Sequence, residues 1–454
     1  MTEVKIIFGI KSRYIIKKVF ALLGKRSRLL IINKNNKLKD ILNVNINDYR
    51  DNYRILSSIE IELKPSHLYG EFINLDRKNE EEKDREKNYH IYFNDNKEEI
   101  KNKYYLDEND KVTKIKIVID YKEKSLAHIF SRCPAIKSIN FKRFLRNNIE
   151  DMSDMFYECI CLEEINLTNF TTDNVIDMSY MFHGCSSLKR LDLTSFNTSN
   201  VKEMNAMFHG CTLLETINVS TFDTSNVTDM SKMFSKCPSL KEVNVSNFNT
   251  ENVDNMSYMF NDCSLLKNLE LSNWDTFSVK DISYIFSDCI SLEEIDLSNF
   301  KTDNVNSMDG MFSGCIALKK INLEKFNTHN ANKMNGMFFK CISLKYINLS
   351  NFITNDVYNM SEFFSGCSSL KKIDLHNFNT ENVKDMREMF SGCISLEEVD
   401  IYNFNFDGIN NKQKIFCGCA SLKLINIAPQ QIPYLDNELI KECSKELRFT
   451  HEQD

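Results

Sequence analysis

Between residues 125 and 427 the hydrophobic positions of the chain follow a pattern that repeats every 26 residues. Each repeat is marked by a cysteine, and the positions of a repeat are counted here from that cysteine, so that +3 lies three residues after it. Eleven equal intervals without an insertion or deletion predict structural copies stacked as a solenoid. The twelve cysteines of this ladder are Cys133, Cys159, Cys185, Cys211, Cys237, Cys263, Cys289, Cys315, Cys341, Cys367, Cys393 and Cys419.

The first half of each repeat has the pattern of a short strand. Leucine stands at +3 and aliphatic residues stand at +6 and +8, as in Leu188, Leu191 and Leu193. Apolar, polar and apolar residues in alternation predict a strand with one buried face. An aromatic residue follows at +11, for example Phe196, and we expect its ring to fill the interior where the strand ends.

The second half of each repeat has a different spacing. In residues 201–211 the apolar side chains follow one another at intervals of 3, 3, 1 and 3, which predicts one face of about three helical turns. Asn200 precedes this segment and Glu203 stands three residues later, which is the pattern of a capping box. Gly210, before the cysteine, is expected to help end the helix.

These two halves predict an α/β fold, namely a leucine-rich-repeat-like solenoid of about 12 coils, each with a short parallel strand and a short helix. The cysteine is expected to face inward as the last residue of the helix. Parallel strands stack at about 4.8 Å, so twelve coils would form a body roughly 55 to 60 Å long.

Both ends of the chain depart from the repeat. Residues 1–110 are expected to form a separate helical or α+β region, with a charged linker at 76–87. The solenoid is expected over 111–427, with an atypical first coil that carries alternating isoleucines. Residues 428–454 are expected to close the solenoid as a C-terminal cap containing a short polar helix.

The amino-acid sequence of the repeat resembles that of a known family. The segment "IDLHNFNTENVKDMREMFSGCISL", residues 373–396, is similar to the BspA-like leucine-rich repeats of the form "NFNT..NV..M..MF.GC.SL", which occur in bacterial surface proteins and in protists. The resemblance covers residues 125–427. It implies a leucine-rich-repeat fold and a role in adhesion or partner binding.

Residues 14–42 faintly resemble an F-box, although the Leu-Pro pair with which an F-box normally begins is absent. That resemblance implies docking to a ubiquitin ligase. The alternative interpretation is a small helical pair packed on a core. The apolar positions that carry the resemblance are Ile16, Phe20, Leu23, Leu29, Leu30, Leu38 and Leu42.

Charge and hydropathy narrow the class of partner and the compartment. The chain has 57 basic and 64 acidic residues and a net charge of −7, so no nucleic-acid partner is expected. Basic residues interrupt the most apolar early stretch, near residues 14–32, so we expect neither a membrane span nor a secretory signal peptide. A cytoplasmic location follows as the expectation, with the cell surface as the alternative.

Few residues suggest catalysis or metal binding. No CxxC pair and no P-loop, GxGxxG, HExxH or GxSxG motif occurs, so we predict no catalytic, cofactor or metal site and no enzyme. The ladder cysteines are expected to be reduced and buried. His183 and His209 share one repeat position and are expected to lie on the surface.

Position +5 should point outward from the sheet, where packing does not fix the residue. We predict either a stripe that binds a protein partner or a merely solvated face. The leading hypothesis is a non-enzymatic protein–protein interaction module; the alternatives are an F-box-like adaptor of a ubiquitin ligase and a cell-surface adhesin. The stripe consists of Glu164, Arg190, Thr216, Glu242, Asn268, Glu294, Lys320, Tyr346, Lys372 and Glu398.

Overall fold

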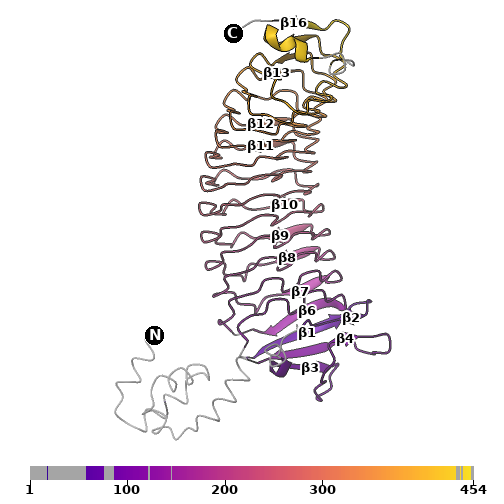
Figure 1. Cartoon of the computed structure of the whole chain (residues 1–454). Helices are drawn as coiled ribbons and strands as arrows, with labels where there is room; N and C mark the ends of the chain where they lie inside the picture. Colours follow the sequence, from indigo (N-terminus) through magenta and orange to yellow (C-terminus); the bar gives the residue numbers. More distant parts are fainter. Residues whose placement is uncertain are drawn as a thin grey trace.

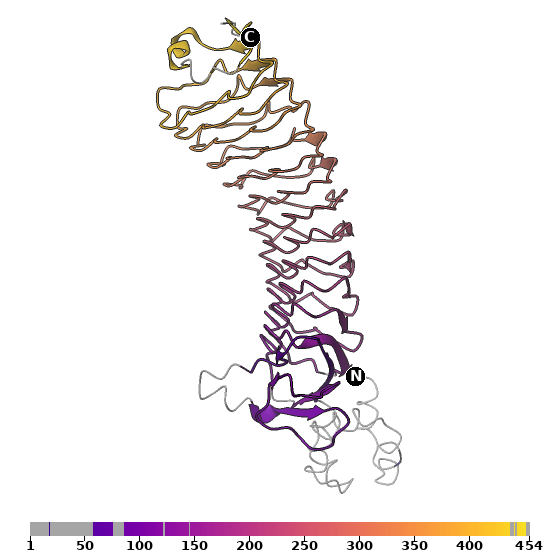
Figure 2. The same cartoon turned by 90° about the vertical axis from the view of Figure 1, so that its right-hand side faces the viewer.

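The structure is a computed structural model, and it describes residues 18, 58–75, 86–120, 123–144, 146–435, 440 and 443–450. Figure 1 shows that the repeats form about twelve coils stacked in one column, so the predicted solenoid is confirmed. The turned view in Figure 2 shows a gentle bend of the column toward its C-terminal end. The expected F-box-like segment, apart from Lys18, and most of the expected charged linker lie outside the described residues.

The strands of the coils line one side of the column and pair in parallel with an offset of one repeat. Leu191, for example, lies opposite Ile217. The pairing is interrupted between residues 164–166 and 190–192 and again at residues 268–270 and 346–348, so the coils carry separate stacks of strands rather than one continuous sheet. The strands are β6 (Ile136–Arg143), β7 (Glu164–Asn166), β8 (Arg190–Asp192), β9 (Thr216–Asn218), β10 (Glu242–Val243), β11 (Glu294–Asp296), β12 (Lys320–Asn322), β13 (Lys372–Asp374), β14 (Glu398–Asp400) and β15 (Leu424–Asn426).

The expected short helix in each coil is wrong. In the coils within residues 123–427 that segment is a succession of turns, and alternate N–H groups bond in two directions. The N–H of His209 donates to the carbonyl of Ala206 in the same coil at 3.1 Å. The N–H of Ala206 donates to the carbonyl of Ser231 in the next coil at 2.7 Å. The backbone thus divides its hydrogen bonds between its own turn and its neighbour.

The spacing of the coils explains why a helix is excluded. An α-helix with its side chains is about 10 Å wide, whereas parallel strands lie about 4.8 Å apart. Two phenyl ladders inside the column have similar short spacings, 5.4 Å between Phe208 and Phe234 and 6.5 Å between Phe222 and Phe248. A flat succession of turns fits this thickness on both sides of the coil.

The turns require positive φ angles at fixed positions. Ala206 has φ 52° and Gly210 has φ 73°. A type II turn needs such an angle at its second central residue. Asn200, which the sequence suggested as a helix cap, instead donates its Nδ2 to the carbonyl of Asp173 in the preceding coil at 2.7 Å. The residues assigned to helix caps therefore belong to turns and contacts between coils.

Two small groups of strands and turns close the ends of the column. At the N-terminal end β3 (Tyr89–Phe93), β5 (Ile115–Ile119), β1 (Ile59–Pro65), β6 and β7 form one sheet in that order. This sheet runs across the boundary expected at residue 110. Beside it lie the pair β2 (Gly70–Glu71) and β4 (Tyr105–Leu106) and the 3-10 helix η1 (Glu86–Asn88).

At the C-terminal end the 3-10 helix η2 (Pro429–Tyr434) follows β15, and β16 (Arg448–Thr450) pairs with β15 in parallel. The pattern of the repeat does not predict this last strand. Because β16 covers the edge of β15, it extends the sheet by one strand beyond the final coil.

Candidate interaction surface

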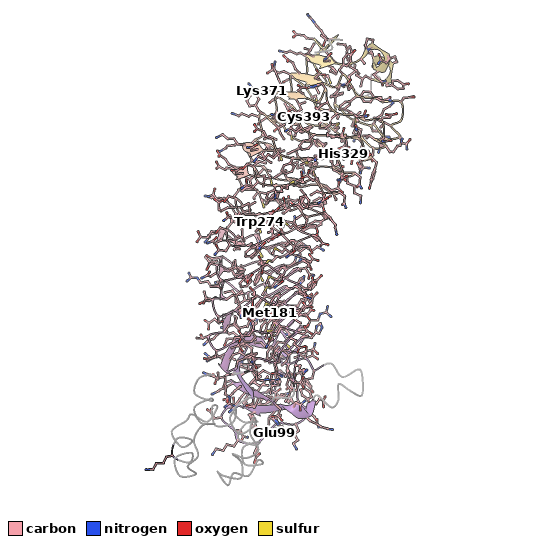
Figure 3. All side chains as sticks on the ribbon, turned by 90° about the vertical axis from the view of Figure 1, so that its left-hand side faces the viewer. Glu99, Met181, Trp274, His329, Lys371 and Cys393 are labelled. Atoms are coloured by element: carbon pink, nitrogen blue, oxygen red, sulfur yellow. The ribbon has the colours of Figure 1, made fainter. Side chains whose placement is uncertain are left out.

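The residues at +5 lie on the strand side of the column, and the ladder cysteines lie inside it. All twelve ladder cysteines are fully buried. Nine of the ten stripe residues are exposed, and Glu398 is half-buried. Figure 3 shows the difference: Lys371, next to the stripe residue Lys372, lies at the edge of the column that carries the strands, whereas Cys393 lies within it.

A second exposed row lies at +4; it was not predicted, although it follows the same 26-residue register. In the N-terminal coils this row alternates in charge, and neighbouring side chains pair. Lys137 lies 3.3 Å from Glu163, and Lys241 lies 2.8 Å from Glu215. Alternation of positive and negative side chains is typical of a solvated surface. Each exposed ion pair contributes only about 0 to 1 kcal/mol to the stability of the fold.

The rows at +4 and +5 change character in the middle of the solenoid. Three consecutive coils carry five lysines and one tyrosine, with no acidic residue at either position. All six side chains are exposed, and that of Tyr346 is 67% exposed. We call this group the lysine patch; it consists of Lys319, Lys320, Lys345, Tyr346, Lys371 and Lys372.

The lysine patch is neutralised only at its ends. Lys319 pairs with Glu293 at 2.6 Å, and Lys372 pairs with Glu398 at 2.6 Å. Among the described residues no acidic side chain pairs with Lys345 or Lys371. The N–H of Lys371 faces the carbonyl of Lys345 at 3.5 Å, so the two ammonium groups belong to neighbouring coils. Like charges on neighbouring strands repel, so the fold gains nothing from this arrangement.

An open hollow of about 710 Å³ lies next to the lysine patch and shares part of its rim. Its apolar lining comes from position +6 of four successive coils, namely Leu269, Ile295, Ile321 and Ile347. Ile295 is buried and the other three are only partly buried. Two of the three interruptions of strand pairing, those at residues 268–270 and 346–348, lie at the two ends of the hollow.

An apolar row accompanies the hollow on the turn that leads into each strand. Ile290, Ile316 and Ile342 occupy position +1 of three consecutive coils and are 39%, 39% and 43% exposed. The coils that form the hollow therefore combine exposed aliphatic groups with lysines. Apolar groups rimmed by polar ones are typical of protein-binding surfaces.

His183 and His209 do not lie freely on the surface, as the sequence suggested; they are half-buried in a column of rings. Their centroids are 4.6 Å apart, and Tyr157 stacks on His183 at 4.6 Å. Burial, together with the nearby His183 and two lysines, lowers the pKa of His209 to about 4. The column therefore consists of neutral imidazoles at neutral pH, and no carboxylate hydrogen-bonds to either ring among the described residues.

The ladder thiols connect each coil to the one before it. The thiol of Cys211, for example, donates to the carbonyl of Phe182 at 3.2 Å, and every ladder cysteine from Cys159 onward makes the same contact. Burial raises the pKa of the Cys237 thiol to about 12. Thiolates are the reactive form of cysteine, so this ladder has a structural role.

All fifteen cysteines lie in the described part of the chain, and each is a free thiol. The described residues contain no group of three or more metal-ligating side chains. They also include no helix that is both long enough and apolar enough to cross a bilayer.

Comparison with solved structures finds weak likenesses to leucine-rich repeat proteins. A leucine-rich cell surface protein from Faecalibacterium prausnitzii is 18% identical, with a TM-score of 0.40, over 71% of this chain and 86% of that chain. A chain of the Toll–Spatzle complex of Drosophila is 12% identical, with a TM-score of 0.21, over 62% of this chain and 42% of its own length. The ectodomain of the receptor kinase GASSHO1/SCHENGEN3 from Arabidopsis thaliana is also 12% identical, with a TM-score of 0.22, over 67% of this chain and 42% of that one. Scores this low give these likenesses no weight for function.

No curated protein matches the chain. A family model does match, over residues 124–243, 214–320 and 314–427, which together span the coils. The narrower BspA-like assignment stays a prediction. The chain belongs to the repeat family described as "Mycoplasma protein of unknown function, DUF285".

Proposed function

We propose that the chain is a non-enzymatic protein-interaction module that binds a protein partner on the strand side of its solenoid. The observation that carries this proposal is the open hollow of about 710 Å³, with Tyr346 67% exposed at its rim. Exposed tyrosines beside an apolar depression are typical of the centres of protein interfaces.

The regularity of the rest of the molecule supports this location. Threonine, asparagine and cysteine side chains in the interior and on the turns bond to neighbouring coils, as Thr198 does to the carbonyl of Asp223 at 2.9 Å. The positions at +4 and +5 make few such bonds to the backbone, so their residues can vary without cost to the fold. Partner specificity would reside in these two rows.

The other possibilities raised by the sequence stay predictions. An F-box-like adaptor would depend on residues 14–42, which lie outside the described residues apart from Lys18. The location of the chain, cytoplasmic or at the cell surface, also stays a prediction.

The proposal is tested by site-specific photo-crosslinking of the full chain in cells that produce it. A photoreactive phenylalanine analogue replaces Tyr346 on the strand side in one variant, and replaces the exposed His329 on the turn side in a second. We expect discrete adducts of defined mass from position 346 and none of these from position 329. Position 346 giving no adduct, or both positions giving the same adducts, would count against a strand-side interface.

A further inference from the structure

We propose that the lysine patch and the adjoining hollow bind an extended acidic segment of the partner, with an apolar side chain in the hollow and carboxylates opposite the lysines. This inference rests on the proposed function, because it specifies the partner of the same surface. It uses three observations: an uncompensated charge, an apolar floor beside it, and acidic coils on both sides.

The first observation is the charge that the fold leaves unpaired. Lys345 and Lys371 occupy the same position on neighbouring coils, and neither makes an ion pair with any described residue. In the N-terminal coils the same row alternates, and Lys241 pairs with Glu215 at 2.8 Å. Two adjacent exposed cations without an ion-pair partner repel each other weakly, and a bound anion would relieve this repulsion, so the surface is complementary to carboxylates.

The second observation is the apolar floor of the hollow. Leu269, Ile321 and Ile347 are partly buried, and the depression above them is open. Covering their exposed area would contribute roughly 25 cal/mol per Å² of apolar surface removed from water. A partner that presented only charge would leave this area wet. An apolar residue next to the acidic run would fill it.

The spacing of the coils sets the length of the bound segment. Residues 268 and 372 belong to coils that are four steps apart, or about 19 Å at the spacing of parallel strands. An extended chain advances about 3.3 Å per residue, so about six residues would span the hollow and the lysine patch. The apolar residue would lie toward Leu269, and the acidic residues would lie toward Lys371.

The third observation favours a short acidic peptide over a nucleic acid. Glu293 and Glu294 precede the lysine patch, and Glu397 and Glu398 follow it, at the same two positions. A phosphate backbone carries one negative charge about every 3.4 Å along a strand and would meet these carboxylates on both sides. The proposed segment would place its apolar part over the first acidic coil, where Glu294 and Asp296 also line the hollow, and about six residues end before they reach the second acidic coil.

The test measures binding of fluorescent peptides to the full chain by anisotropy. The probe has a short run of leucine followed by a run of glutamate, and the comparison peptide has glutamine in place of every glutamate. We expect the glutamate probe to bind, with an affinity that falls as the salt concentration is raised. The glutamine peptide should bind at least about tenfold more weakly than the glutamate probe. Equal binding of the two peptides, or no binding of the glutamate probe, would overturn the inference.

Paired variants locate the site. Replacing Lys345→Gln together with Lys371→Gln removes two exposed charges, and we expect about tenfold weaker binding of the glutamate probe. The matched control is Lys189→Gln with Arg190→Gln, which removes the same amount of charge from positions +4 and +5 of a coil outside the lysine patch and should leave binding unchanged. Equal losses in both variants would mean general charge attraction and would contradict a defined site.

A single-stranded oligonucleotide is the third probe. The oligonucleotide could bind more tightly than the glutamate probe, and the Lys345 and Lys371 changes could weaken that binding. In that case the ligand would be a phosphate backbone and the inference would be wrong. The two proposals can fail separately. If position 346 still gave crosslinks to a partner but the glutamate probe did not bind, this inference would be wrong and the proposed function would stand.

Discussion

Phe312 shows what a single residue contributes to this fold. Its ring is fully buried and lies 5.7 Å from that of Phe286 and 5.6 Å from that of Phe338, in a ladder with one ring per coil. Removing it would open a cavity and interrupt the stacking in the middle of the column. The side chain therefore acts on three coils at once.

We expect Phe312→Ala to lower the free energy of unfolding by about 3 to 5 kcal/mol, as buried phenylalanine truncations do. Guanidinium titration followed by circular dichroism measures the change. The control is Phe277→Ala, whose ring is 55% exposed and whose loss should cost less than about 0.5 kcal/mol. Similar losses in the two variants would mean that Phe312 does not lie in the interior.

His209 makes stability depend on pH. Its pKa in the folded chain, about 4, lies below the ordinary value of 6.5, so between these values the unfolded chain binds a proton that the folded chain does not. Stability is therefore lost as pH falls from about 6.5 toward 4 and is fully present above that window. The denaturation midpoint, measured at several pH values, should fall less steeply for His209→Asn than for the unaltered chain.

His329→Asn is the control for that comparison, because His329 is exposed on a turn. It should retain the pH dependence of the unaltered chain. If His209→Asn retained it as well, another group would be responsible for the loss at low pH.

The sequence could predict burial residue by residue because burial follows spacing. Leucine at +3, the aromatic at +11 and the cysteine of each repeat all lie inside, for example Leu188, Phe196 and Cys211. The histidine column could not be predicted in the same way. Whether His183 and His209 stack depends on how closely two coils approach each other, and no local pattern states that distance.

At the scale of one element, the turn segment shows why the predicted helix was wrong. The intervals of 3, 3, 1 and 3 in residues 201–211 bring the same side chains inward in a helix and in a succession of turns. A helix and a succession of turns differ in the carbonyl group to which each backbone N–H donates. For Phe208 that partner is the carbonyl of Met233, 25 residues away, which a local pattern cannot reveal.

Threonine at +13 joins neighbouring coils at the start of this element. The hydroxyl of Thr302 donates to the carbonyl of Asn327 at 2.8 Å and accepts from the N–H of the same residue at 2.8 Å. Thr302 is fully buried. Valine has the same shape without the hydroxyl, so Thr302→Val would leave the N–H and the carbonyl of the partly buried Asn327 without this partner.

We expect Thr302→Val to destabilise the chain by about 1 to 3 kcal/mol, measured by urea titration. Thr168→Val is the control, because the Thr168 hydroxyl is exposed and, among the residues that the structure describes, bonds only to the nearby Asn166 side chain. That change should alter stability by less than about 0.5 kcal/mol. A neutral Thr302→Val would show that the contact between coils contributes little.

At the scale of the whole molecule, the regular offset of one repeat makes each coil a removable unit. Every pairing between coils, such as Asp281 with Ser307, joins equivalent positions 26 residues apart. Deleting residues 290–315 would join Cys289 to Ile316 and restore the same sequence of positions. Nearest-neighbour contacts would be preserved everywhere else.

We therefore expect the chain without residues 290–315 to remain folded, with a circular dichroism spectrum like that of the full chain and resistance to limited proteolysis. Deleting only residues 290–302, half of a coil, would place turn residues against strands and should abolish folding. Equal behaviour of the two deletions would contradict the solenoid. Most of this architecture could be predicted from the cysteine spacing alone, whereas the hollow and the interruptions of strand pairing depend on small displacements between coils.

The similar thickness of each coil on its strand side and its turn side has a consequence for how such a chain can evolve. A copy inserted by tandem duplication of one repeat moves the far end outward by one coil and does not make the column close on itself. The number of repeats sets the length of the column, and the exposed residues of a few repeats set what it binds. Selection can therefore change the length and the binding specificity independently.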